Sequence, residues 1–76
     1  MKQKIIEIQL QTQIIIDLIV QKNANEAQQK LVEVHEQLDE LIDFSDDGDD
    51  LIELSRFQVL LNHLQQKIVL LKAEQN

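Results

Sequence analysis

Two segments of this chain repeat apolar residues at spacings of three and four, and this feature constrains the fold more than any other. Such spacing places the side chains on one face of an α-helix. One segment is predicted to be helical over about residues 25–44 and carries its apolar residues at Ala24, Ala27, Leu31, Val34, Leu38 and Leu41. The other is predicted over about residues 50–73 and carries them at Leu54, Phe57, Leu61, Leu64, Ile68 and Leu71. The pattern predicts an all-α fold.

The stretch FSDDGDD, residues 44–50, separates these two helices and contains Gly48, the single glycine of the chain. Aspartate, serine and glycine favour turns and helix N-caps, so the helices are expected to fold back as an antiparallel hairpin with facing apolar stripes. Asn25 is the expected N-cap of the first of these helices.

The N-terminal segment IIEIQLQTQIIIDLIV, residues 5–20, fits two periodicities. As a strand, it places its even-numbered apolar residues on one face. As a helix, it shows one stripe at Ile5, Ile8, Thr12, Ile15 and Ile19, and a second at Ile6, Leu10, Ile14 and Leu18. Strands usually span about five or six residues, so the length favours a third, N-terminal helix over about residues 3–22. The open alternative is a long N-terminal β-strand that joins the helical hairpin in a ribbon dimer.

A chain of 76 residues buries a small core, and with no cysteine it has no disulfide to stabilise it. The N-terminal segment also has more apolar surface than one hairpin covers. We therefore predict a single helical domain over residues 1–76 that forms a homo-oligomeric bundle, most simply a two-fold dimer. The expected interface consists of Ile5, Ile6, Ile8, Leu10, Ile14, Ile15, Ile16, Leu18 and Ile19.

The formal net charge is −7, from fourteen acidic and seven basic residues. This charge opposes binding to the phosphate backbone of nucleic acids. No apolar run approaches the about 18 residues of a membrane span, because Glu7, Gln9 and Asp17 interrupt the opening stretch. The composition predicts a cytoplasmic protein with neither nucleic acid nor membrane as a partner.

Ten of the fourteen acidic residues lie between Glu33 and Glu53, and no lysine or arginine occurs between Lys30 and Arg56. Acids near the C-terminus of a helix oppose its dipole, so Asp39, Glu40 and Asp43 break a local rule, as sites often do. We predict that an acidic tip binds a protein partner with a basic surface. The acidic tip consists of Glu36, Asp39, Glu40, Asp43, Asp46, Asp47, Asp49, Asp50 and Glu53.

Two patterns in the sequence resemble metal sites. Asp43, Ser45, Asp47 and Gly48 match the first positions of a calcium loop, but Leu54 stands where its final glutamate is required. A zinc site would need two histidines, at residues 35 and 63, to meet across the hairpin. With no nucleophile motif and no glycine-rich phosphate loop, we predict no catalytic residues, no cofactor, no metal and no enzymatic activity.

The predicted function is a small acidic protein-binding module, an oligomeric regulator or inhibitor of the phage, mobile-element, anti-sigma-like or immunity type. The main alternative is a purely structural coiled-coil oligomerisation module. Minor alternatives are a metal-binding hairpin and a ribbon-helix-helix-like DNA binder. The segment HEQLDELI, residues 35–42, resembles the S-Q-E-L-D signature of small helical-hairpin phosphatases that act on sporulation response regulators; Leu38 and Asp39 match, and His35 stands in place of the serine.

Overall fold

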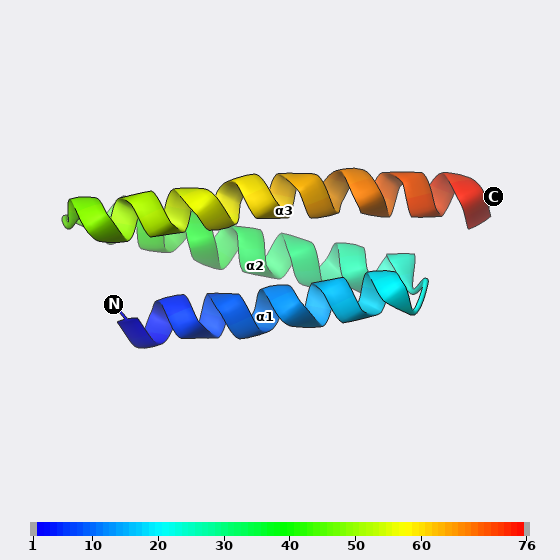
Figure 1. Ribbon diagram of the computed structural model, residues 1–76, viewed down its shortest axis with the longest axis horizontal. Coiled ribbons are helices and arrows are strands. Elements are labelled where there is room, and N and C mark those ends of the chain that lie inside the picture. The colour runs from blue at the N-terminus through cyan, green and yellow to red at the C-terminus, as the bar shows by residue number, and fades with distance from the viewer. Residues whose placement is uncertain (1, 76) are drawn as a thin grey trace.

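The computed structural model describes residues 2–75, which form three α-helices (Figure 1). They are α1, Lys2–Val20; α2, Ala24–Phe44; and α3, Gly48–Gln75. The helices lie side by side in a body of 43 × 17 × 15 Å, with α2 antiparallel to both neighbours. Each helix contacts the other two. The all-α prediction is confirmed, and since the described residues contain no strand, the strand alternative for residues 5–20 is not supported.

The turn between α1 and α2 comprises residues 21–23 and closes α1 with a Schellman motif. The Lys22 N–H donates to the carbonyl of Ile19 and the Asn23 N–H to that of Leu18, both at 2.9 Å. Lys22 has a φ of 62°, a conformation that favours glycine. Asn23 precedes α2, while Asn25 lies inside its first turn, so the prediction that Asn25 is the N-cap was wrong.

The turn between α2 and α3 comprises residues 45–47, and Asp47 caps α3. Its Oδ1 accepts a hydrogen bond from the Asp49 N–H at 2.8 Å, and its carbonyl oxygen accepts one from the Leu51 N–H at 3.0 Å. Gly48, expected in the turn, is instead the first residue of α3. It has no positive φ, and a Cβ added there would meet no atom within 4 Å. The aspartate cap, not the glycine, therefore begins the helix.

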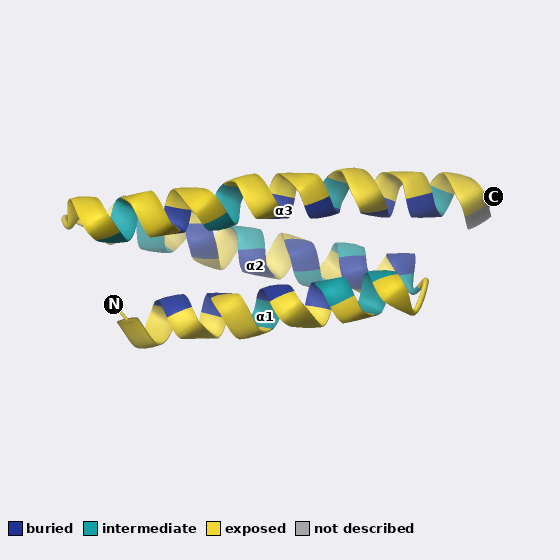
Figure 2. Cartoon of the chain, in the orientation of Figure 1, coloured by how far each residue is buried: buried dark blue, intermediate teal, exposed yellow. Residues whose placement is uncertain are grey.

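The core lies along the line where the three helices meet (Figure 2). It contains Ile5, Ile8, Thr12 and Ile15 from α1, Ala24, Ala27, Leu31, Val34 and Leu38 from α2, and Leu54, Leu61, Leu64, Ile68 and Leu71 from α3. The buried hydroxyl of Thr12 donates to the carbonyl of Ile8 at 2.7 Å, so this polar group is satisfied within its own helix. Between α2 and α3, Gln65 Nε2 donates to Gln28 Oε1 at 3.1 Å.

Candidate functional site

The first candidate surface is a second apolar stripe on α1. Figure 2 shows that α1 is exposed along the side that faces away from α2 and α3. Its members are Ile6, Leu10 and Ile14, which are 48%, 61% and 43% exposed. We call these three residues the outer stripe. They are spaced by four residues, so they follow one another along a single helix face. A helix at the surface of a small bundle packs one face against the core, so the apolar residues on the opposite face of α1 lie outside the core of this chain.

The nine residues predicted to form an oligomer interface divide into three groups. Ile5, Ile8 and Ile15 are buried in the core of the chain itself. The partly buried residues Ile16, Leu18 and Ile19 pack against that core. The third group is the outer stripe. Of these nine residues, the three of the outer stripe are the most exposed and are the ones able to meet another molecule.

The acidic tip is the second candidate surface, where α2 ends and α3 begins (Figure 1). Asp50 is half-buried and the other eight members are exposed. His35 Nδ1 lies 3.2 Å from Asp39 Oδ2, one turn apart on α2, an ion pair when the imidazole is protonated. Phe44, the last residue of α2, is 79% exposed among these acids. The tip therefore combines dense negative charge with one free aromatic ring.

The packing of the helices distributes the charged residues unevenly along the length of the bundle. One half, which we call the acidic half, comprises residues 2–10 and 36–56 and holds ten acidic and three basic residues. The other half, residues 11–35 and 57–75, holds four of each and is neutral. The entire formal charge of −7 consequently lies at the end of the bundle that carries the acidic tip.

The metal-ligand patterns of the sequence do not come together in the fold. Among residues 2–75, no three His, Asp or Glu side chains gather as they would around a metal ion. The carboxylate of Asp47, the fifth position of the calcium pattern, is occupied in capping α3. His35 contacts Asp39 on its own helix, and His63 is exposed.

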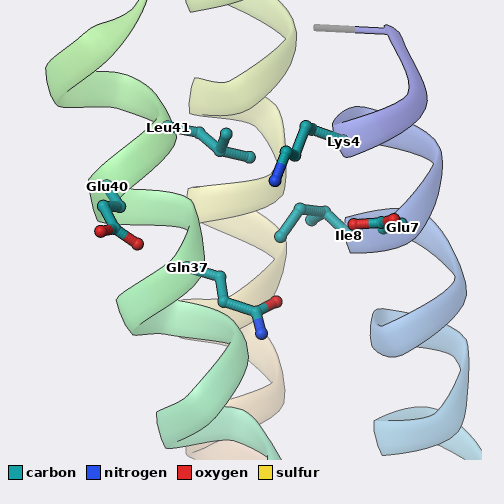
Figure 3. Close-up of a pocket in the computed structure, with 6 residues that line it drawn as sticks. All are labelled: Lys4, Glu7, Ile8, Gln37, Glu40 and Leu41. Atoms are coloured by element: carbon teal, nitrogen blue, oxygen red, sulfur yellow. The ribbon is translucent and has the colours of Figure 1, made fainter.

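A hollow of about 260 Å³ lies between α1 and α2 in the acidic half (Figure 3). Lys4 and Ile8 of α1 and Gln37 and Leu41 of α2 point into the space between the two helices. Glu7 and Glu40 complete its lining. The hollow offers an ammonium, two carboxylates and an amide. Sequence reasoning missed it; the only available signal was the spacing of four that puts Lys4 beside Ile8 on α1.

A smaller, largely apolar hollow of about 210 Å³ lies between α1 and α3, near the far end of the bundle. It is lined by Ile16, Ile19, Val20, Leu60, Leu64 and Lys67. Its walls belong to the edge of the core, because Leu64 is buried and Ile16 and Ile19 pack against the core cluster.

Comparison with known proteins gave no relative: no protein-family model, no curated protein and no solved structure matches the chain significantly. Within the helices of residues 2–75, none is both long and apolar enough to cross a membrane.

Proposed function

We propose that this protein is a non-enzymatic binding module whose acidic tip docks on a basic surface of another protein. The observation that carries the proposal is the placement of the whole net charge of −7 in the acidic half. Charge concentrated at one end steers association over long range, which raises the association rate and makes it fall with salt. The module acts as a regulator or inhibitor by covering the basic surface of its partner.

The test compares two variants that each remove three negative charges. The tip variant carries Asp39→Asn, Glu40→Gln and Asp43→Asn, all near the C-terminus of α2. The control variant carries Glu26→Gln, Glu33→Gln and Glu74→Gln, all in the neutral half. Proteins captured by the wild-type chain from cells that produce it should be lost with the tip variant and kept with the control.

For a captured protein, the association rate at low salt should fall about tenfold or more with the tip variant, within the range that electrostatic steering supplies. The control should leave this rate nearly unchanged. If both variants lower the rate equally, overall charge accounts for binding and the acidic tip has no special role.

A second function, self-assembly, is favoured by the outer stripe. A fully buried aliphatic side chain contributes about 1.5–3 kcal/mol relative to an exposed one, so three half-exposed residues retain a driving force for association. Sedimentation equilibrium should detect dimers of the wild-type chain. Leu10→Glu should abolish them, whereas Leu70→Glu should not, although Leu10 and Leu70 are 61% and 64% exposed. Equal effects of the two substitutions would exclude the outer stripe as the association surface.

A further inference from the structure

We propose that two copies of this chain pair through the outer stripe of α1 in antiparallel orientation, with the two-fold axis beside Leu10. The inference rests on the proposed self-assembly and adds its geometry. Three features of the chain support this geometry: the spacing of the residues on α1, the charges at the two ends of that helix, and the position of the acidic half.

The outer stripe is symmetric about Leu10. Ile6 and Ile14 lie four residues before and after it, and the polar residues that bound the stripe, Gln3 and Asp17, lie seven residues before and after it. A two-fold axis at Leu10 therefore places Ile6 against the partner's Ile14, and the Gln3 amide against the partner's Asp17 carboxylate. A two-fold interface requires one surface to complement itself, and this sequence of side chains does so. A second copy supplies the complement without any foreign protein.

The charges at the ends of α1 oppose the dipole of that helix. Lys2 and Lys4 lie in its first turn, and Asp17 lies near its end, with no acid in the first turn and no base in the last. Positive charge at a helix N-terminus and negative charge near a C-terminus are both unfavourable within one helix. Antiparallel pairing puts the partner's Asp17 beside Lys2 at each end of the pair, so the partner offsets these unfavourable charges. Lys4 points toward α2 and takes no part in this pairing.

Parallel pairing of two α1 helices would instead bring like charges together at Asp17. Asp17 is exposed on the same face as the outer stripe, and it accepts a hydrogen bond from Gln13 Nε2 at 3.1 Å. In a parallel pair, each Asp17 would face the same carboxylate of the other copy across the seam. Opposed like charges across an interface disfavour that arrangement.

The acidic half selects the same orientation at longer range. In a parallel pair, the two ends of charge −7 would lie at the same end of the dimer. In an antiparallel pair, they lie at opposite ends of a body 43 Å long. The Debye length at physiological salt is about 8 Å, so the repulsion between these two ends is stronger in the parallel pair than in the antiparallel one, where it is largely screened.

Cysteine cross-linking distinguishes the two orientations, because the natural chain has no cysteine. The variants are Gln3→Cys, Asp17→Cys, Leu10→Cys and, as a control on α3, Leu70→Cys. Tagged Gln3→Cys and untagged Asp17→Cys chains are mixed, oxidised under mild conditions and separated without reductant. Antiparallel pairing should give the mixed disulfide in about tenfold excess over the Gln3→Cys homodimer, the ratio that corresponds to 1.4 kcal/mol between orientations.

Each other outcome overturns a defined part of the proposal. If the Gln3→Cys homodimer is the main product, the pairing is parallel, and self-assembly survives without this geometry. If Leu10→Cys cross-links no more than Leu70→Cys while sedimentation still shows dimers, the chain assembles through another face and the inference fails. If the wild-type chain is monomeric at every concentration tested, the proposed self-assembly and the inference fail together.

Discussion

Ile14 and Ile15 are adjacent in the sequence but differ in burial on α1, so truncating each tests the helix directly. Ile15 is 0% exposed, whereas Ile14 is 43% exposed. Ile15→Ala removes core packing and should lower the free energy of unfolding by about 2–5 kcal/mol. This is a large share of the roughly 4–11 kcal/mol expected for a domain of 76 residues.

Ile14→Ala is the matched substitution on the outer face. It removes the same atoms from a half-exposed site and replaces a β-branched residue by a better helix former, so its cost in the monomer should stay below about 1 kcal/mol. Urea unfolding followed by far-UV circular dichroism measures both values. Protein concentrations below the dimer range isolate the monomer, and a larger effect of Ile14→Ala at high concentration would report the dimer.

The relative size of the two losses in unfolding free energy distinguishes a helix from a strand in this segment. In a strand, the even-numbered face of residues 5–20 would be the core, and Ile14→Ala would then be the more damaging change. A loss at Ile14 equal to or greater than that at Ile15, measured on the monomer, would refute the burial pattern of α1.

Substitutions at three sites, two of them with a control variant, test the ends of the helices by thermal unfolding. Asp47→Ala removes the cap of α3 and should cost about 1 kcal/mol, whereas Asp46→Ala should stay within about 0.5 kcal/mol; equal effects would contradict the capping role. Lys22→Gly relieves the φ of 62° and should stabilise the chain by up to about 1 kcal/mol, while Lys22→Ala should not. Gly48→Ala should stabilise it by about 0.4–1 kcal/mol, since the site is open and φ is not positive; a loss would show that the glycine is required.

The core of α2 and α3 could be predicted because the sequence repeats at the period of the helix itself. Leu38 and Leu61, which the spacing placed on the inner faces, are fully buried. The two stripes of α1 were also predicted, and the structure buries one at Ile8 and Ile15 and exposes the other at Leu10. In this segment the local periodicity did not distinguish a helix from a strand. Which of the two stripes is buried depends on the surface that α2 and α3 form together, and this surface is set by tertiary packing.

The ends of the helices and the hollow beside Lys4 were less accessible to sequence reasoning. Gly48 was expected in a turn because glycine favours turns, yet the carboxylate of Asp47 caps α3 and Gly48 is its first residue. Lysine has no preference for the left-handed backbone conformation, so the sequence did not indicate the Schellman motif at Lys22. The hollow between α1 and α2 depends on how closely two helices approach at Ile8, which spacing along one helix does not specify.

The two three-residue turns bear on how fast this chain folds. They place α1 against α2 and α2 against α3, so two of the three helix contacts join neighbours in the sequence, and only α1 with α3 is remote. Helical proteins rich in such local contacts fold within about microseconds to milliseconds. A chain with an unusually aliphatic first helix thus spends little time unfolded, and short exposure limits aggregation before the bundle closes.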